Sequence, residues 1–378
     1  MHKKIFIVVL IIAVFALSFV SLAQALPELP RVYIDTTMPV QAGQTFTVTS
    51  CANLQSTINS AALGDTIIID SSLTCTGNYV LPEKTTGSGW IIIKSSALAN
   101  LPPEGVRVTP QYSQYMPKII TPGLPSLSAN LRANHYRIIG IEFGIKQGLY
   151  QTGAIIDLDP SATTIPDYPH HIILDRVYIH GNPTDNSHRA VLLGGQHMAV
   201  IDSYISEIHS TSNPDTQAIA DWNGMGPYKI VNNFLSSAGE NLIFGGAVAS
   251  QPNAIPSDVE IRRNHFYKPL SWFSQDPSYA GIPWGVKNLI EFKVGQRILM
   301  DGNIFENNWP QAQTGYGILF KSSTQNAASS WTVTRDLTFT NNIVKGMPRA
   351  VNLCPDDCPG PSQDAGWYMF KNNIFDDI

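Results

Sequence analysis

The stretch Asn303-Ile304-Phe305, an asparagine followed by two apolar residues, is one copy of a repeat that decides the fold. The same pattern recurs at Asn233-Phe234-Leu235, Asn264-His265-Phe266, Asn342-Ile343-Val344 and Asn373-Ile374-Phe375, and weaker copies begin at Ile141, Arg176 and Ser203. From Arg176 onward, successive copies lie 27, 30, 31, 39, 39 and 31 residues apart. Periods of this size are typical of stacked units, none of which can bury its apolar face alone.

The segments between the copies have the pattern of short strands. Runs such as His171–Leu174 and Lys229–Val231 are separated by Gly, Asn, Asp and Pro. The only helix that we predict is Leu54–Ala62, just before a first strand at Thr66–Ile69. Several strands per period without an intervening helix exclude βαβ units and predict an all-β parallel coil. In such a coil the repeated asparagines would stack and hydrogen-bond along the axis, so we interpret them as structural.

The N-terminus has the features of a secretory signal peptide. A basic start at Lys3 and Lys4 precedes the apolar run Ile5–Val20, and Ala23-Gln24-Ala25 offers a cleavage site. An uncleaved membrane anchor is the alternative. We expect residues 1–25 to be the signal, 26–50 an N-terminal strand and lead-in, and 51–378 the coil. The mature protein would be secreted, periplasmic or at the cell surface, without membrane association.

The end of the sequence predicts that the coil is incomplete. The chain stops at Asn372–Ile378, one step into a new turn. A solenoid needs a polar cap on its last repeat, and none is evident here. We therefore expect a fragment whose missing part carries further turns.

Charge and cysteine content narrow the class of protein. The formal net charge is −5, which argues against nucleic acid as a partner. Four cysteines fit an oxidising compartment, and three pairings are open. We favour the local pairing Cys51–Cys75 with Cys354–Cys358. No spacing of Cys and His resembles a zinc site, and we expect a monomer.

Four stretches carry a resemblance to known proteins. Leu54–Ile69 resembles the N-terminal cap and first turn of the pectate-lyase-like superfamily, which implies a right-handed parallel β-helix with a short N-terminal capping helix. Ala238–Gly246, Trp284–Asn288 and Gly302–Trp309 resemble a group of secreted bacterial β-helix repeat proteins without an assigned activity. The resemblance extends roughly from Val32 to the end. Because this fold hosts lyases, hydrolases, esterases and adhesins, it implies the fold, with polysaccharide as the expected partner.

Counting back from the asparagines places side chains on the faces of one sheet. If an aromatic column fills the coil, two columns face outward because strand side chains alternate. The aromatic column is Trp222, Phe244, Phe292 and Phe320, and the outward columns are Asp221, Ile243, Glu291 and Leu319, then Asn223, Gly245, Lys293 and Lys321. Carboxylates, an amide and lysines on a flat face suit an acidic sugar chain, and Gly245 with Gly246 would leave a groove. The alternative is an ordinary solvated face of mixed charge.

Two catalytic mechanisms and one non-catalytic role fit this face. For β-elimination on a uronate, Lys293 would be the base, Arg297 or Lys321 would neutralise the carboxylate, and Asp221 or Glu291 would bind a cation. For a glycoside hydrolase, Asp221 would pair with Glu240 or Glu291. A rigid polysaccharide-binding or surface module is the third reading. The lysines favour β-elimination.

Calcium is the only cofactor that the sequence suggests. Asn232–Glu240 resembles the motif of the chondroitinase-B and alginate-lyase family, in which a glutamate at the place of Glu240 helps to bind calcium. The family's second glutamate falls on Leu242 and its Lys-Ser pair falls near Gly245, so neither the full calcium site nor the catalytic lysine carries over. Any calcium would depend on Glu240 together with Asp221.

Three further residues are candidate substrate contacts. His188 and Arg189 lie together at the entrance of a predicted strand, where an imidazole and a guanidinium could meet an acidic sugar. Trp284 lies in the long insertion Lys268–Val286, which could form a wall for sugar stacking.

Overall fold

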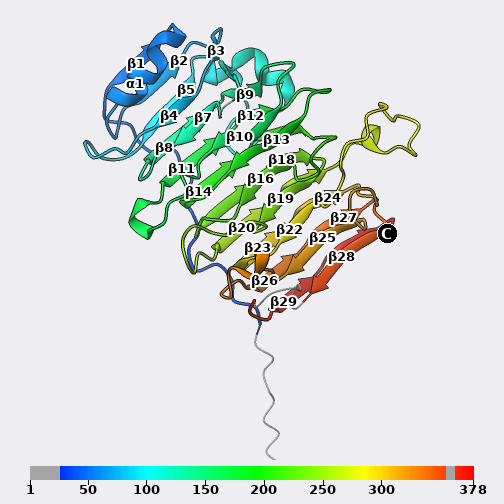
Figure 1. Ribbon diagram of the computed structural model, residues 1–378. Helices are drawn as coiled ribbons and strands as arrows, with labels where there is room; N and C mark the ends of the chain where they lie inside the picture. Colours follow the sequence, from blue (N-terminus) through cyan, green and yellow to red (C-terminus); the bar gives the residue numbers. More distant parts are fainter. Residues whose placement is uncertain (1–25, 124, 355–361) are drawn as a thin grey trace, which may run out of the picture.

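The computed structural model describes residues 26–123, 125–354 and 362–378. Within these residues the chain winds into three parallel sheets of nine, ten and eleven strands. Each strand pairs with the equivalent strand of the next turn, so the sheets run the length of one coil (Figure 1). This is a right-handed parallel β-helix, as predicted.

The strands have the following bounds. The nine-stranded sheet contains β4 (Tyr79–Leu81), β7 (Leu127–Ala129), β10 (Gln151–Asp157), β13 (Ser187–Leu192), β16 (Gln217–Asp221), β19 (Glu240–Phe244), β22 (Ile290–Phe292), β25 (Tyr316–Lys321) and β28 (Arg349–Cys354). The ten-stranded sheet contains β3 (Thr74–Thr76), β6 (Lys118–Thr121), β9 (Glu142–Ile145), β12 (Tyr178–His180), β15 (Tyr204–Ile208), β18 (Phe234–Ser237), β21 (His265–Tyr267), β24 (Ile304–Glu306), β27 (Ile343–Lys345) and β30 (Ile374–Asp376). The eleven-stranded sheet contains β1 (Thr45–Val48), β2 (Thr66–Ile69), β5 (Ile91–Ser95), β8 (Asn134–Ile139), β11 (His170–Asp175), β14 (Gln196–Ile201), β17 (Tyr228–Val231), β20 (Ser257–Arg262), β23 (Gly295–Asp301), β26 (Thr334–Thr340) and β29 (Gly366–Lys371).

One short α-helix, α1 (Leu54–Ser60), covers the N-terminal end of the described coil, close to the predicted Leu54–Ala62. Its C-terminal carbonyls are satisfied by Lys84, whose Nζ donates to the carbonyls of Ile58 at 2.7 Å and Ala61 at 2.6 Å. Short 3₁₀ segments occur at Cys51–Asn53, Leu98–Asn100, Pro110–Tyr115, Ile165–Asp167, Leu270–Trp272 and Gln325–Ala327.

The core is a stack of identical or similar side chains, one from each turn. Phe266 and Phe305 stack with ring centroids 4.6 Å apart, and Phe244 and Phe292 do so at 4.8 Å. These spacings match the distance between hydrogen-bonded strands, about 4.8 Å. The coil therefore buries its apolar residues as continuous columns along the axis.

The predicted asparagine ladder is confirmed. The Nδ2 of Asn264 donates to the Oδ1 of Asn303 at 3.1 Å, and Asn303 donates in the same way to Asn342 at 2.9 Å. Asn233 and Asn373 extend the ladder at its two ends. At the N-terminal side, the backbone amide of Ser203 donates to the Oδ1 of Asn233.

The weak copy that we placed at Arg176 is one residue early. Tyr178 pairs with Tyr204, so Val177 stands opposite the ladder position of Ser203. Val177 has no polar side chain that could mark the ladder position, so the sequence did not reveal the true start of this copy.

The lead-in crosses the outward face of the eleven-stranded sheet. The guanidinium of Arg137 in β8 donates to the Thr36 carbonyl at 2.7 Å, and the amide of Arg31 donates to Asp258 in β20 at 2.9 Å. The amide of Glu28 reaches Asp336 in β26 at 3.1 Å. Residues 26–41 therefore tie together turns that are far apart in the sequence.

Of the two predicted disulfides, Cys51–Cys75 is present. Cys358 lies outside the described residues, so the bridge Cys354–Cys358 stays a prediction; the Sγ of Cys354 lies 3.0 Å from the Oδ1 of Asn352. Among the described residues, no helix is long and apolar enough to cross a membrane.

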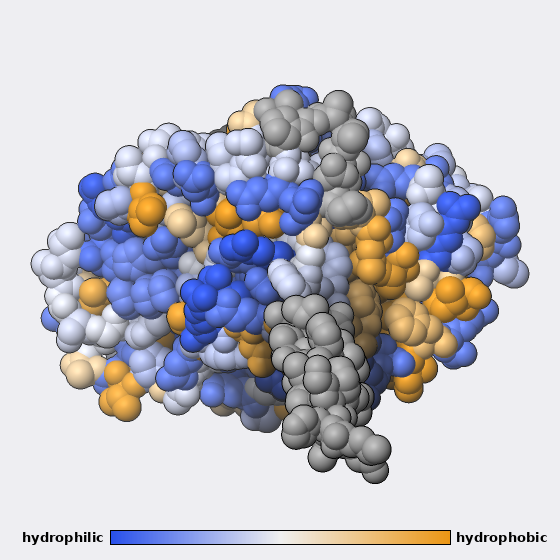
Figure 2. Space-filling view, turned by 90° about the horizontal axis from the view of Figure 1, so that it is seen from below, coloured by the Kyte–Doolittle hydropathy of each residue, from blue (hydrophilic) through white to orange (hydrophobic). Residues whose placement is uncertain are grey.

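The last described turn leaves large apolar side chains exposed, namely Trp367, Phe370, Ile374, Phe375 and Ile378. The view from below shows orange, hydrophobic residues in a band beside hydrophilic ones (Figure 2). The outer edge of this turn is thus hydrophobic.

Candidate functional site

The outward face of the nine-stranded sheet carries a strip of apolar side chains that leads to a charged cluster. Leu192, Ala220 and Ile243 stand in register on β13, β16 and β19, and the next position, on β22, is Glu291. The apolar residues pack with Ala154 and with Trp222 in a cluster separate from the coil interior. A flat apolar strip that ends in charged groups is the shape of surface that can accommodate a sugar chain.

The placement of Asp221 on this face was wrong. Asp221 pairs in register with Phe244, which belongs to the core, and Asp221 is itself fully buried. Its Oδ1 accepts a hydrogen bond from the amide of Gly224 at 2.9 Å, and burial raises its pKa to about 7. Trp222, which we assigned to the core, lies outside it. An offset of one residue is enough for this error, because it moves every side chain of a strand to the other face.

Asn223 is also placed differently from the prediction. It is buried, its Nδ2 donates to Asp159 at 3.1 Å, and its Oδ1 accepts from the amide of Ser250 at 2.8 Å. These bonds tie two loops together and leave the amide turned away from the face. Asn223 is therefore a structural residue in this arrangement.

Arg297 and Trp284 are not brought to the face. Arg297 lies on β23 of the eleven-stranded sheet, where its Nε bonds to Asp258 at 2.6 Å. Trp284 is buried and stacks on His209 with ring centroids 3.7 Å apart. Trp284 packs with Trp272 and Trp309 at the base of its insertion, so this ring supports the loop and offers no stacking surface for a sugar.

Glu291, Lys293 and Lys321 do come together as predicted. The Nζ atoms of Lys293 and Lys321 lie 3.6 Å and 3.3 Å from the Oε1 of Glu291. The side chain of Glu291 is 2% exposed, while the two lysines are 21% and 16% exposed. The Oε2 of Glu291 has no hydrogen-bond partner among the described residues. One buried carboxylate thus holds two ammonium groups at the surface.

The predicted groove at Gly245 and Gly246 is filled by a lysine. A Cβ at Gly245 would lie 2.8 Å from the Cβ of Lys293, and one at Gly246 would lie 3.7 Å from its Nζ. Both glycines also adopt positive φ, +93° and +87°, which other residues rarely adopt. The glycines make room for Lys293 to lie along the sheet, so their role is to position that side chain.

Glu240 lies at the edge of the same face, within a second charged group. It is fully buried; its Oε2 accepts from the Nε2 of Gln217 at 2.9 Å, and its Oε1 forms an ion pair with Lys287. Lys287 also lies 2.6 Å from Asp215, which is exposed. Burial raises the pKa of Glu240, and Lys287 opposes that shift. Glu240 therefore acts on Lys287 and cannot touch a substrate directly in this arrangement.

Arg189 and His188 border this group. Arg189 pairs in register with Gln217, and its guanidinium lies over the ring of Trp222, 5.0 Å from the ring centroid. Its Nη1 lies 3.1 Å from the Nδ1 of His188. Trp222 packs against the apolar strip, so it connects Arg189, and through Arg189 the neighbouring His188, to the proposed face.

The sequence reasoning missed Lys287, Gln217 and Asp157. Lys287 follows Trp284 by three residues, and an outward position could not be inferred without the fold of the insertion. Asp157 stands in register with Leu192, and burial raises its pKa to about 6. A carboxyl group that titrates near neutral pH on the strip is a candidate acid or base.

Comparison with known proteins finds solved structures that align with the chain at low sequence identity. No family model and no curated protein matches the chain. An alginate lyase from Paenibacillus sp. str. FPU-7 aligns at 14% identity with a TM-score of 0.49, covering 89% of this chain and 100% of that one. A mannuronic acid specific family 6 polysaccharide lyase from human gut microbiota aligns at 10% identity with a TM-score of 0.42, covering 88% of this chain and 82% of that one. The Yersinia enterocolitica family 28 exopolygalacturonase aligns at 12% identity with a TM-score of 0.41, covering 89% of this chain and 66% of that one. The likeness is one of fold alone.

The charged cluster suits an anion better than a calcium ion. Four cations, Arg189, Lys287, Lys293 and Lys321, face three carboxylates, Asp215, Glu240 and Glu291. Calcium takes six to eight oxygen ligands. The two residues that we predicted for calcium do not fit it, because Asp221 faces the coil interior and Lys287 occupies the carboxylate of Glu240.

Proposed function

We propose that the chain cleaves an acidic, uronate-containing polysaccharide by β-elimination on the outward face of the nine-stranded sheet. The observation that carries this proposal is the pair of lysines, Lys293 and Lys321, held at the surface by one buried carboxylate at the end of an apolar strip. An acidic sugar chain needs both surfaces, because its ring faces are apolar and its carboxylates are anionic.

The reaction assigns a role to each lysine. β-Elimination requires a base that removes the proton α to the uronate carboxylate, and positive charge that stabilises the resulting enolate. Lys293, in its neutral form, would take the proton, and Lys321 would neutralise the carboxylate. The bond between C4 and the glycosidic oxygen would break as the C4–C5 double bond forms, and the leaving sugar oxygen would take a proton from water. Glu291 is then a positioning residue, since its Oε1 lies 3.6 Å and 3.3 Å from the Nζ atoms of the two lysines.

The second charged group would extend the binding site along the strip. Arg189 and Lys287 lie on the Glu240 side of the face, and Arg189 is stacked on Trp222. A polysaccharide that carries one carboxylate per sugar can place successive carboxylates against the two groups. Arg189 and His188 are therefore proposed substrate contacts, and Glu240 positions Lys287.

A glycoside hydrolase is the second candidate, because two buried carboxyl groups stand on adjacent strands. Glu240 on β19 and Glu291 on β22 could divide the roles of acid and base, and burial raises the pKa of Glu240 as a general acid requires. Two observations oppose this candidate. Glu240 is fully buried and its Oε1 is paired with Lys287, which lowers its pKa against the effect of burial. The Oε1 of Glu291 is paired with Lys321.

The test is an activity assay with two readouts. The purified protein is incubated with alginate, polygalacturonate and chondroitin sulfate, and both ultraviolet absorbance of an unsaturated product and new reducing ends are measured. Both signals are expected to rise with one of the substrates. Reducing ends without the absorbance would indicate hydrolysis, and binding without either signal would indicate a non-catalytic module.

A variant pair then tests the assignment of the base. Lys293→Ala is expected to lower kcat by about 100-fold or more, the usual contribution of a positioned base. Lys345→Ala is the matched control, because Lys345 is an ion-paired lysine on the ten-stranded sheet and should not change kcat. Unchanged turnover in Lys293→Ala would remove Lys293 from the mechanism.

A further inference from the structure

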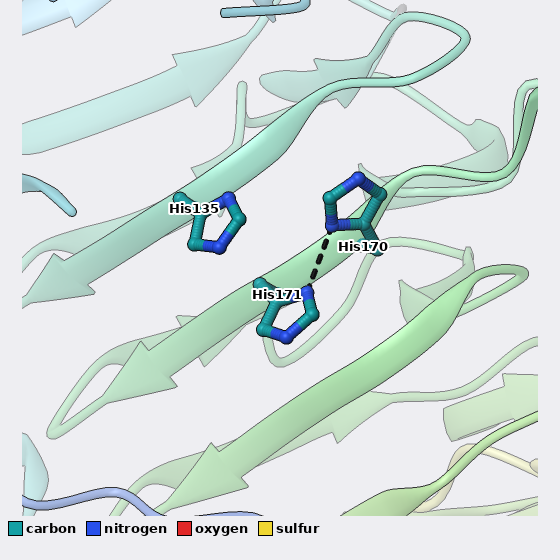
Figure 3. Close-up of side chains that lie close together, drawn as sticks. All are labelled: His135, His170 and His171. Atoms are coloured by element: carbon teal, nitrogen blue, oxygen red, sulfur yellow. Dashed lines mark hydrogen bonds between the residues drawn. The ribbon is translucent and has the colours of Figure 1, made fainter. Parts of the chain in front are cut away.

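Three histidines lie together on a different sheet from the proposed active face. His135 comes from β8, and His170 and His171 come from the neighbouring strand β11 of the eleven-stranded sheet (Figure 3). Each offers one ring nitrogen, and these three atoms lie within 4.8 Å of one another. The Nδ1 atoms of His170 and His171 are 2.8 Å apart. Nothing in the proposed catalytic mechanism uses these residues.

The coil itself brings the imidazoles together. His135, His171 and His197 occupy equivalent positions on successive turns, and each has a positive φ, between +51° and +57°. Their rings stack with centroids 4.5 Å apart in both steps, at interplanar angles of 11° and 12°. Asp258, Arg297 and Asp336 have positive φ at one shared register position on later turns, so the fold repeats this conformation along the sheet. His170 adds a second imidazole from β11.

A cavity borders His171, one of the three imidazoles, and can supply water to an ion bound there. A cavity of about 410 Å³ beneath the lead-in is lined by His171, His197, Trp90 and Asp35, among others. Trp90 contacts the rings of His135 and His171 edge-on at 5.4 Å and 6.1 Å.

We propose that His135, His170 and His171 form a binding site for a zinc ion, with water from the cavity as the fourth ligand. Three imidazoles and one open position are a ligand set that zinc accepts in tetrahedral geometry. Ligands about 2.05 Å from zinc lie about 3.3 Å apart, so the nitrogens of His170 and His171, now 2.8 Å apart, need to separate slightly. The rings of His135 and His171 are stacked at 11°, so one of these two rings must also turn until both in-plane lone pairs point at the ion. The ion would join two turns of the coil under the lead-in.

Binding has a proton balance that can be measured. The contact between the two Nδ1 atoms is a hydrogen bond, so one of them carries the proton. A zinc ion that takes both nitrogens must displace that proton, which moves to the other ring nitrogen or to solvent. Zinc binding should therefore shift the tautomer of one ring or release a proton, and it should weaken at acidic pH.

The experiment uses the full chain without an affinity tag that binds metals. After chelator treatment, zinc is titrated by calorimetry and the bound metal is counted by atomic absorption. One ion per chain is expected, with a rise in Tm. His170→Gln and His135→Gln should each weaken binding by about 100-fold, since each removes one of three protein ligands.

The controls separate this site from non-specific binding. His265→Gln removes an imidazole that pairs with Glu306 on the ten-stranded sheet, and it should leave zinc affinity unchanged. Cobalt gives a second readout, because ligation by three imidazoles in a four-coordinate site produces much stronger visible absorption, at longer wavelength, than octahedral aqueous cobalt. Far-ultraviolet circular dichroism checks that each variant folds. No binding at zinc concentrations up to millimolar, or equal binding by the His170→Gln variant, would overturn the proposal.

Discussion

Asp221 carries a carboxyl group that faces the interior of the coil. It stands in the same column as Phe244, and the hydroxyl of Tyr228 lies beside it. Because burial raises its pKa to about 7, the group stays protonated in the folded protein over a pH range in which it is ionised in the unfolded chain. A residue that looks catalytic by type is therefore a pH-sensitive part of the core.

The folded state is expected to lose stability as pH rises from about 4 to about 7. Below about pH 4 the contribution of protonated Asp221 is fully present, and it is lost as pH rises through about 7. In Asp221→Asn this side chain cannot ionise. The variant should therefore lose part of the decrease in the free energy of unfolding between pH 5 and 8, on the order of a few kcal/mol. Urea unfolding at the two pH values measures it.

Asp276→Asn is the matched control for this experiment. Asp276 is an exposed loop residue whose pKa is lowered by hydrogen bonds from Ser278, so its contribution changes only at lower pH. Its variant should keep the wild-type slope between pH 5 and 8. An identical slope in Asp221→Asn would show that this carboxyl group does not titrate in that range.

At the scale of one element, the asparagine ladder joins every turn from Asn233 to Asn373 by the same set of bonds. Asn303 donates to Asn342 and to the carbonyl of Ile261, and it accepts from the amide of Asn264. All of these groups are buried. If one asparagine is removed, its partners lose their hydrogen bonds and cannot bond to water instead. The ladder therefore links the turn between two sheets to its neighbours on both sides.

Asn303→Ala is expected to destabilise the coil by on the order of 3 kcal/mol, because it leaves several buried polar groups unpaired. Asn373→Ala, at the partly exposed end of the ladder, should cost about 1 kcal/mol or less. Denaturant unfolding of the two variants, compared with the wild type, measures the difference. Equal losses in the two variants would mean that the ladder does not depend on burial for its strength.

At the scale of the whole molecule, the coil is quasi-one-dimensional, and each turn contacts mainly the next. A local change should therefore loosen nearby turns and leave distant ones intact. The disulfide Cys51–Cys75, with a sequence separation of 24, joins the segment before α1 to β3 at the N-terminal end.

Cys51→Ser is expected to reduce the stability of the N-terminal turns by about 3 kcal/mol, the value for a closed loop of this length. Hydrogen exchange should accelerate in α1, β2 and β3 and stay unchanged in β22 and β25. Cys354→Ser, at the other end of the coil, is the control. Uniform acceleration along the chain would show that the coil unfolds as one cooperative unit.

The sequence by itself determined the features that repeat. The spacing of the asparagines predicted the parallel coil and the ladder, and the short helix at Leu54 and the bridge Cys51–Cys75 were predicted from local patterns. Glu291, Lys293 and Lys321 were placed on one outward face because they lie close to phenylalanines that fill the core, and alternation along a strand is strict.

Only the tertiary structure decided the features that depend on loop length and on what folds over a face. Asp221 and Trp222 exchange sides because the loops between strands differ in length, and an offset of one residue reverses the faces. Arg297 belongs to another sheet, and Trp284 is buried against Trp309 and other residues. His135 and His171 lie 36 positions apart in the sequence and meet because each turn of the coil returns the chain to the same place. Strand patterns are local, whereas register and burial are set by contacts between turns.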